Sequence, residues 1–541
     1  MQSASSFQRR KHPRVFVQLQ AAITAAVPKA DSAIIPCQII DLSRYGIQFE
    51  ADQEIPCNAE LALISIVFLN LANAVVGLKI LRERPLSDGK VMYAGGLSFT
   101  HEDTRRKIHT LLRTLASNNI ADRRREERRH IDAPPKQDRR RQRRRRQLGI
   151  FSDCISFTNR LDAWRASYFH YQRVESRVPG RASINGQELI SFASKDYLGL
   201  THHPRVKEAA IRAVARYGTS TTGSRALNGT HPLHEELERE IADFKGTEAA
   251  LIFPGGYFAN VAILSGLLKK EDIVFADEDV HASIIDGCVT GGAKVILFRH
   301  NSFDNLSLKL NRYQHDRRLI IVEGVYSVNG DLGCLPKIHE VAESHQVPLM
   351  VDDGHGFGVL GNTGSGAAEH FNLTDRIDLD MGICSAALAG IGGFVACKKY
   401  VRDYLLHFSR GILFTTSLTP GTTAGILEAL RVIRTEPSLR AKLWSNVRHL
   451  KSGLLALGYD IFPTESAIIS IPVGDEQKTY KFAHMLKERG IYVNTFRRPA
   501  VKRGQGRLRL SVSAAHSEAD IAAALDVFRH FKHNVDLKGC P

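Results

Sequence analysis

Short apolar runs alternate with amphipathic helical segments from about residue 150 onward. The runs at 295–298, 319–324 and 347–353 each end in a polar or glycine-rich loop, and segments such as 234–244 carry apolar residues at helical spacing. This alternation predicts right-handed βαβ units and a mostly parallel sheet, which is an α/β fold. After about residue 425 the pattern predicts a smaller α+β unit.

The first part of the chain has a different pattern, that of short strands followed by one helix at 103–119. Its longest apolar stretch, 61–78, has the length of a membrane span, but Asn70 and Asn73 interrupt it and it is rich in valine and isoleucine. Two consecutive strands explain this composition better than a membrane helix. We therefore expect a protein that is not transmembrane.

Charge is concentrated in one arginine-rich segment. The chain carries a net charge of +16, and half of it lies in residues 122–146, which lack apolar periodicity and contain a Pro134–Pro135 break. Such a segment repels itself and is typical of a solvated linker. It either acts as a spacer or binds nucleic acid, an anionic membrane surface or an acidic partner.

The remaining composition is that of a globular protein with several domains. The length of 541 residues corresponds to about two to four domains, and 43% of the residues are apolar, which excludes fibrous and wholly disordered proteins. The predicted parts are 1–120, the linker 121–149, a large domain at 150–425 and a small domain at 426–541.

The eight cysteines contain no C-x-x-C pair, so the sequence predicts neither a metal site nor a disulfide framework. The N-terminus lacks the apolar core of a secretion signal. Both observations favour a reducing compartment, and we expect a cytoplasmic protein.

Two short motifs near the N-terminus form a candidate anion site. Arg10 and Arg14 are spaced R-x-x-x-R, and Asp41, Ser43 and Gly46 follow with the spacing D-x-S-x-x-G. Residues 6–117 resemble a PilZ domain, a β-barrel whose members bind the second messenger cyclic diguanylate through these motifs. Arginines suit its phosphates and guanine edges, the polar residues suit the guanine edge, and glycine suits the turn. The alternative is a PilZ fold that serves only protein contacts.

A second resemblance covers residues 165–535. The matching segments are SKDYLGL (194–200), YGTSTTGSRALNGTHPLHEELE (217–238), FPGGYFAN (253–260), HASIIDG (281–287), EGVYSVNGD (323–331), DDGHGFGVLG (352–361), FTTSLTP (414–420) and GRLRLSVSAAH (506–516). Together they resemble the α-oxoamine synthases, which are fold-type I enzymes dependent on pyridoxal phosphate (PLP). The family includes aminooxononanoate synthase and serine palmitoyltransferase. It condenses an amino acid with an acyl thioester.

The resemblance implies a set of cofactor-binding residues. Gly256 and Tyr257 match the loop that holds the phosphate at a helix start. His281 matches the imidazole that stacks on the cofactor ring, Asp352 the partner of the pyridine nitrogen, and His355 the partner of the phenolic oxygen. An ionised partner at 352 keeps the ring protonated and a better electron sink.

The same resemblance implies further contacts. Ser327 and Ser385 belong to the cofactor site, and Thr416 matches a hydroxyl that reaches the phosphate of a neighbouring subunit. That contact implies a dimer with shared sites. Arg509 matches the clamp for the amino-acid carboxylate, and Arg497 resembles a second, mobile arginine.

One segment departs from the family. Where the family has the lysine that carries the cofactor, the segment 382–394 has Ala386, and Ile383 replaces a phosphate-binding threonine. Lys398 and Lys399 lie too far along the chain to replace that lysine. The cofactor is therefore expected to bind without a covalent link, and more weakly. Lys195, where the family has Asn or Ser facing the substrate channel, is a speculative substitute amine, or it binds an acyl carboxylate or faces solvent.

Three functions follow as alternatives. The first is a PLP-dependent acyltransferase, regulated by cyclic diguanylate and impaired on its own by Ala386. The second is a non-catalytic subunit or pseudoenzyme that pairs with a lysine-bearing homologue, so the chain is expected to form a homodimer or a heterodimer. The third is a signalling scaffold in which the large domain binds an amino acid, an acyl thioester or a protein.

Overall fold

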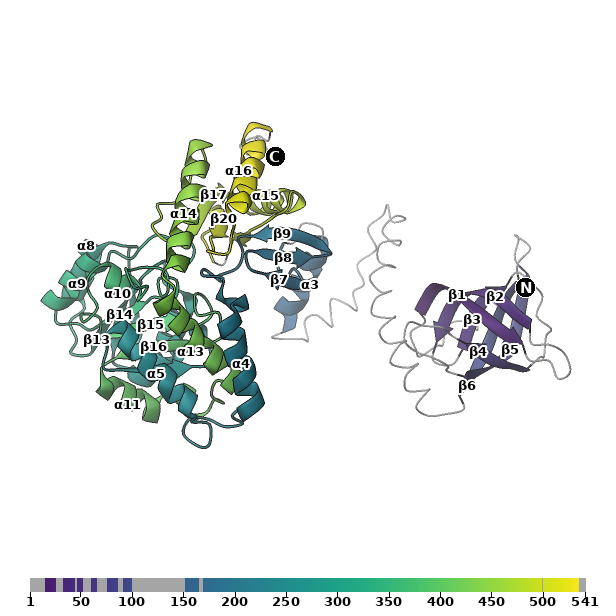
Figure 1. Ribbon diagram of the computed structural model, residues 1–541, viewed down its shortest axis with the longest axis horizontal. Coiled ribbons are helices and arrows are strands. Elements are labelled where there is room, and N and C mark those ends of the chain that lie inside the picture. Colours follow the sequence, from purple (N-terminus) through teal and green to yellow (C-terminus); the bar gives the residue numbers. More distant parts are fainter. Residues whose placement is uncertain are drawn as a thin grey trace. The chain divides into compact units, whose positions relative to one another are not determined.

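The computed structural model describes residues 151–164, 169–498 and 500–534 and the backbone of six strands between residues 15 and 99. The chain divides into two compact units, Met1–Ser152 and Asp153–Pro541 (Figure 1). In the part of the chain that the structure describes, no helix is long and apolar enough to span a membrane.

The N-terminal unit contains a closed antiparallel barrel in the order β1-β2-β3-β6-β5-β4. Its strands are β1 (Val15–Ala25), β2 (Ala33–Ser43), β3 (Gly46–Ala51), β4 (Glu60–Ser65), β5 (Val75–Pro85) and β6 (Val91–Phe99). The apolar stretch 61–78 thus contributes to two consecutive strands, as predicted.

The turn between β2 and β3 holds the second predicted motif. Ser43 at the end of β2 pairs with Gly46 at the start of β3, and Asp41 lies two residues earlier on β2. Arg10, Arg14, the predicted helix at 103–119 and the arginine-rich segment 121–149 lie outside the described residues.

The C-terminal unit is built around a seven-stranded sheet of order β10-β16-β15-β14-β13-β11-β12, in which only β16 runs antiparallel to its neighbours. These strands are β10 (Ala249–Phe253), β11 (Ile273–Asp277), β12 (Lys294–Phe298), β13 (Arg318–Glu323), β14 (Leu349–Asp352), β15 (Leu379–Ile383) and β16 (Gly393–Cys397). The predicted apolar runs thus lie on β12, β13 and β14.

Helices cover both faces of this sheet. They are α4 (Pro204–Tyr217), α5 (Pro232–Lys245), α6 (Gly256–Leu267), α7 (Ala282–Gly291), α8 (Phe303–Arg312), α9 (Leu335–Ser344), α10 (Ala367–His370), α11 (Lys399–Phe408), α12 (Arg410–Leu413) and α13 (Pro420–Thr435). On β10, Ala250 and Ile252 join one apolar cluster, whereas Leu251 and Phe253 join another. Because successive side chains of a strand point to opposite faces, these clusters are the two sides of the sheet.

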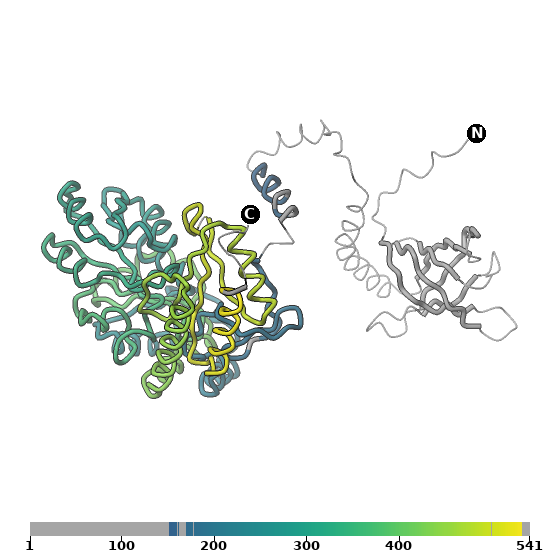
Figure 2. Tube along the Cα trace, turned by 90° about the horizontal axis from the view of Figure 1, so that it is seen from above, coloured from purple at the N-terminus to yellow at the C-terminus, as the bar shows by residue number. Residues whose placement is uncertain are grey.

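A smaller group of elements follows the large sheet in the chain (Figure 2, green to yellow). It comprises α14 (Ser438–Ala456), β17 (Ile468–Gly474), α15 (Glu476–Glu488), β18 (Ile491–Tyr492), β19 (Asn494–Phe496), β20 (Gly506–Ser511) and α16 (Glu518–Asn534). The antiparallel sheet β17-β20-β19 is its centre, which agrees with the predicted small α+β unit. The predicted division at residue 425 falls inside α13, and the boundary stays a prediction.

One of the first strands of the C-terminal unit pairs with a strand of this smaller group. The helix α3 (Ser152–Trp164) precedes β7 (Ser176–Val178), β8 (Arg181–Ile184) and β9 (Gln187–Ser191), and a short 3-10 helix lies at Leu200–His202. The strand β9 pairs in parallel with β18, so residues about 300 positions apart lie side by side (Figure 1). The loop after β9 is thereby fixed against the small sheet.

Candidate active site at the carboxyl end of β14

Asp352 is the last residue of β14 and is held by a chain of polar contacts from two helices. Its Oδ2 accepts a hydrogen bond from Asn260 Nδ2 at 2.7 Å, and its Oδ1 accepts one from the Gly354 N–H at 3.0 Å. Asn260 also reaches Ser283 Oγ at 2.9 Å, and that hydroxyl lies 2.7 Å from His281 Nδ1. Asp352 and His281 are therefore parts of one network at the carboxyl edge of the sheet, where parallel sheets bind ligands.

Asp352 is buried, whereas His281 is exposed. Asp352 is 8% exposed, and burial raises its pKa, although nearby donors and cations oppose the shift. His281 caps helix α7, and its Nδ1 accepts the Ser283 N–H. These contacts fix the orientation of the imidazole, which is exposed.

His355 lies on the loop after β14 and contacts Tyr197. The Tyr197 hydroxyl is 2.7 Å from His355 Nδ1. Burial raises the pKa of Tyr197 to about 12, so this hydroxyl keeps its proton and can donate it. Burial and the Arg509 charge hold the pKa of His355 well below its usual range. A neutral His355 that accepts at Nδ1 presents Nε2–H as a donor.

Arg509 on β20 is a buried cation with an incomplete set of partners. It is 7% exposed, and its Nη1 donates to the Ser327 carbonyl at 2.7 Å. Its Nε has no hydrogen-bond partner, and among the described residues no carboxylate lies within ion-pair distance of its guanidinium. A buried guanidinium without an anion is costly, so this geometry fits an anionic ligand.

The backbone of Ser327 makes two hydrogen bonds at this site, one to Glu323 and one to Arg509. Its N–H donates to Glu323 Oε2 at 3.2 Å, and its carbonyl accepts the bond from Arg509. Burial, followed by the charge of Asp352, raises the pKa of Glu323 well above its usual value. A contact of Ser327 with the cofactor stays a prediction, and in the structure its carbonyl supports Arg509.

Arg497 follows β19 and lines the same pocket as Arg509, with a volume of about 590 Å³. Its Nη1 lies 3.6 Å from Glu476 Oε2, and its guanidinium stacks on the Tyr480 ring at 5.1 Å. Both arginines stack on an aromatic ring, but only Arg497 also has a carboxylate partner among the described residues.

The predicted phosphate loop lies at the start of α6, where backbone N–H groups are free of helical partners. A Cβ added at Gly256 would lie only 2.5 Å from Cγ2 of Ile383, so this position requires glycine. The Tyr257 hydroxyl donates to Asp286, and its ring meets the His281 ring edge-on at 6.3 Å. Ile383 thus brings a methyl group to the loop where a threonine hydroxyl would assist an anion.

Ser385 and Ala386 lie on the loop after β15. Ser385 is half-buried, and Ala386 is 1% exposed and packs in the larger apolar cluster. Lys398 and Lys399 lie beyond β16, are exposed and pair with Glu248 and Asp403. The structure therefore supplies no amine at 386 and none from those two lysines.

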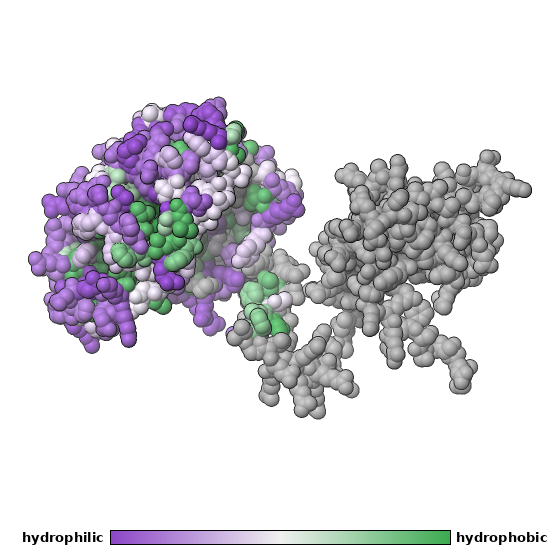
Figure 3. Space-filling model, turned by 90° about the horizontal axis from the view of Figure 1, so that it is seen from below, coloured by the Kyte–Doolittle hydropathy of each residue, from purple (hydrophilic) through white to green (hydrophobic). Residues whose placement is uncertain are grey.

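Thr416 is exposed and forms a β-bridge with Ser224 just before α13. Two apolar side chains lie close to these residues in the chain: Leu227 follows Ser224 and is 83% exposed, and Phe414 precedes Thr416 and is 76% exposed. Figure 3 shows apolar side chains gathered in patches on one face of the C-terminal unit. Such exposed apolar groups are typical of a surface that another chain covers.

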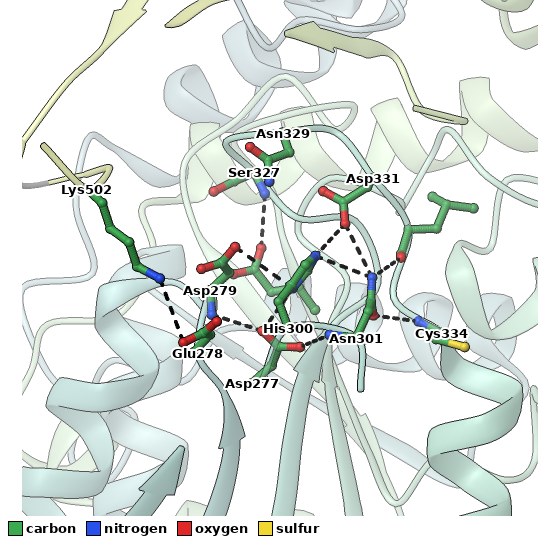
Figure 4. Close-up of polar contacts among 12 residues, drawn as sticks. Asp277, Glu278, Asp279, His300, Asn301, Ser327, Asn329, Asp331, Cys334 and Lys502 are labelled. Carbon is green, nitrogen blue, oxygen red and sulfur yellow. Dashed lines mark hydrogen bonds and ion pairs between the residues drawn. The ribbon is translucent and has the colours of Figure 1, made fainter. Parts of the chain in front are cut away.

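A second polar cluster supports the loop that carries Ser327 (Figure 4). His300 Nδ1 lies 3.0 Å from Asp277 Oδ1, and its Nε2 lies 2.7 Å from Asp331 Oδ2. Although burial opposes the charge, these carboxylates raise the pKa of His300 to about 10. Asn301 bridges the same loop by donating to the Leu332 carbonyl at 2.9 Å. The cluster is an ion-pair network that fixes the loop between β13 and α9, although Oδ1 of Asp331 has no hydrogen-bond partner.

Sequence reasoning missed three residues of the site: Asn260, Ser283 and Tyr197. Asn260 lies one helical turn after Gly256 and therefore faces the same side of α6, a spacing that could have identified it. Ser283 follows His281 by two residues, as capping partners do. Tyr197 reaches His355 across the fold and had no local signal.

Comparisons with known proteins agree in position with both units. Residues 187–528 match the family model of aminotransferase class I and II, and residues 8–117 match that of the PilZ domain. The 8-amino-7-oxononanoate synthase of Petrotoga mobilis is 40% identical over 358 residues, covering 66% of this chain and 91% of the relative. Serine palmitoyltransferase of Sphingobacterium spiritivorum is 39% identical over 388 residues, which cover 71% of this chain and 97% of the relative.

Solved structures of serine palmitoyltransferases are similar to this chain as well. Serine palmitoyltransferase of Sphingomonas wittichii superposes with a TM-score of 0.69 at 33% identity, covering 73% of this chain and 99% of that chain. A lysine-to-alanine variant of the S. paucimobilis enzyme, solved with a bound PLP–myriocin aldimine, gives a TM-score of 0.68 at 35% identity and covers 71% and 97%.

Proposed function

This chain belongs to the aminotransferase class I and II family, and we propose that its C-terminal unit binds PLP and condenses an amino acid with an acyl thioester. The observation that carries the proposal is the buried Arg509, whose unpartnered Nε lies in the same site as the Asp352–His281 network. A carboxylate is the ligand that this guanidinium lacks.

The residues present fit PLP. Asp352 would pair with the pyridine nitrogen, His281 would stack on the ring, and His355 would donate from Nε2 to the phenolic oxygen. The N–H groups at the start of α6 would hold the phosphate, less firmly than in a loop with threonine in place of Ile383. When bound, PLP supplies an electron sink for the carbanion at the amino-acid Cα.

Arg509 would orient the amino acid through its carboxylate. Ala386 provides no amine to hold the cofactor or to move the Cα proton. The solved lysine-to-alanine serine palmitoyltransferase holds a PLP adduct. Its example supports non-covalent binding by a chain with alanine at this position.

Loss of a positioned acid–base group costs about 10²–10⁴ in rate. Unless another amine takes over, this chain would therefore turn over slowly by itself. The alternative is a non-catalytic subunit that pairs with a lysine-bearing homologue, as a heterodimer in place of a homodimer. The exposed Thr416, Leu227 and Phe414 favour a covered face in either case.

Activity of the purified chain tests the proposal. With PLP, an amino acid and an acyl thioester, we expect release of the thiol together with an amino-ketone product. Arg509→Gln should raise KM for the amino acid by roughly 10–100-fold, because a hydrogen bond to a charged group contributes about 1.5–3 kcal/mol. Steady-state kinetics across an amino-acid panel would measure this change.

Arg503→Gln is the matched control, because Arg503 is an exposed arginine in the neighbouring loop. Equal KM values for the two variants would remove the assigned role of Arg509. Activity that arises only when a lysine-bearing homologue is added would favour the non-catalytic subunit.

We further propose that the N-terminal unit binds cyclic diguanylate and thereby regulates the C-terminal unit, in the cytoplasm. The match to a PilZ domain and the position of Asp41, Ser43 and Gly46 at one turn support this proposal. The segment 122–146 is either a spacer or an additional contact to nucleic acid or an anionic surface.

Calorimetry with cyclic diguanylate should give saturable binding that Arg10→Ala and Arg14→Ala each weaken by about tenfold or more, since each removes charge-assisted bonds to the ligand. Arg173→Ala, an exposed position in the other unit, is the control. Absence of binding by the intact chain would leave a PilZ fold that serves protein contacts.

A further inference from the structure

Lys195 lies in a loop that is fixed on both sides at the candidate active site. The carbonyl of Ala193 accepts from Asn494 Nδ2 at 3.0 Å, and that of Asp196 accepts from Ser513 Oγ at 2.6 Å. Tyr197, two residues after Lys195, contacts His355 through its hydroxyl. The backbone that carries Lys195 is therefore held against the pocket rather than free at the surface.

The amine of Lys195 has no partner among the described residues. The side chain is half-buried, and it has no ion pair and no hydrogen bond there. Lys245, the fully buried lysine of the same unit, instead contacts Asp380, Asp353 and the Ser365 carbonyl. A partly buried amine without such contacts is available to react.

Burial, together with a neighbouring cation, shifts Lys195 toward its neutral form. Burial and then the Arg509 charge lower the pKa of Lys195, while Asp352 opposes this shift. Burial and then the same Arg509 charge lower the pKa of His355 as well. A desolvated lysine beside another cation is a recognised form of activated nucleophile.

We propose that Lys195 supplies the amine that position 386 lacks, and that its Nζ condenses with the carbonyl carbon of PLP. This inference rests on the proposed PLP site. In the step, the ammonium first releases a proton, the neutral Nζ attacks the carbonyl carbon, and a carbon–nitrogen double bond forms. The carbonyl oxygen leaves as water, and the new nitrogen regains one proton, so charge and atoms balance. Lys195 reaches the cofactor from the β9 loop instead of the β15 loop.

The test is reduction of the full chain with borohydride in the presence of PLP at neutral pH, where an ordinary lysine with a pKa of about 10.4 is protonated. We expect a PLP-dependent visible absorbance band and, after reduction and digestion, a phosphopyridoxyl group on the peptide that contains Lys195. Lys195→Met and Lys195→Arg should both abolish this label. Lys337→Met, at an exposed lysine on α9, should leave it unchanged.

The Lys195→Arg variant distinguishes a reacting amine from a side chain that only supplies positive charge, because arginine keeps the cation but has no reactive amine. Equilibrium dialysis of PLP against the wild type and both variants is run in parallel. Saturable PLP binding by the wild type without a label on Lys195, or with the label on another lysine, overturns this inference and leaves the proposed function intact. If Lys195→Arg restores amino-acid binding that Lys195→Met loses and the wild type shows no label, the residue is a second cation for the substrate. Absence of saturable PLP binding by the wild type overturns both.

Discussion

Replacing Lys245 by methionine is expected to lower the free energy of unfolding of the C-terminal unit by about 3–5 kcal/mol, because removing one member of a buried ion network leaves the others uncompensated. Lys245 is 1% exposed, and its Nζ lies 2.6 Å from Asp380 and 3.5 Å from Asp353. It also donates to the Ser365 carbonyl at 2.7 Å. Urea unfolding followed by tryptophan fluorescence would measure the loss, since Trp444 lies in this unit.

The loss should depend on pH in a defined direction. Although burial opposes its charge, Asp380 and Asp353 raise the pKa of Lys245, while burial raises the pKa of both carboxyl groups. Without the lysine, these carboxyl groups would titrate still higher in the folded state than in the unfolded state. Their contribution to stability is then present at low pH and lost as pH rises, so the variant should be more impaired at pH 8 than at pH 6.

Lys337→Met is the control for this prediction, because the Lys337–Glu340 pair is exposed and exposed pairs contribute about 0–1 kcal/mol. A Lys245 variant no less stable than the control would mean that the triad is already compensated by protonation of its carboxyl groups.

Introducing lysine at position 386 in a Lys195→Met background is expected to create a PLP-dependent visible band that borohydride fixes to residue 386. Ala386 is 1% exposed, so a charged amine there costs several kcal/mol. The cost is relieved when the amine reacts, and the melting temperature of the variant should therefore rise with added PLP far more than that of its parent. Thermal unfolding with and without PLP, together with peptide mapping, measures both effects.

Ala387→Lys is the matched control, because Ala387 is equally buried but packs against the backbone at Gly358. It should lose stability without rescue by PLP. Rescue of both variants, or of neither, would argue that residue 386 does not face the cofactor.

The large sheet could be predicted from the sequence because its strands are short, have largely apolar centres and are separated by amphipathic helices. The runs that became β12, β13 and β14 have this local signature. Asp352 was predictable as well, since a carboxylate that directly follows an apolar run lies at the carboxyl edge of the sheet. The division of the stretch 61–78 between β4 and β5 was predictable from the asparagines at 70 and 73, which lie between the two strands.

Contacts between distant elements could not be predicted in this way. The pairing of Tyr197 with His355 depends on the loop after β9 meeting the loop after β14. The ion pair of Arg497 with Glu476 and the burial of Lys245 between two carboxylates depend on tertiary packing. In each case the residues next to these positions in the chain carry no signal of the contact, because the partners are brought together only by the fold.

Equilibrium dialysis of PLP against the wild type and Asp352→Asn tests most directly whether the C-terminal unit is a cofactor site. Asparagine keeps the shape and an oxygen that can still accept from Asn260. The expected result is one PLP per chain and an affinity lower by about 10–100-fold in the variant, because a bond to a charged group is lost. Equal binding by the two proteins, or no saturable binding by the wild type, would contradict it.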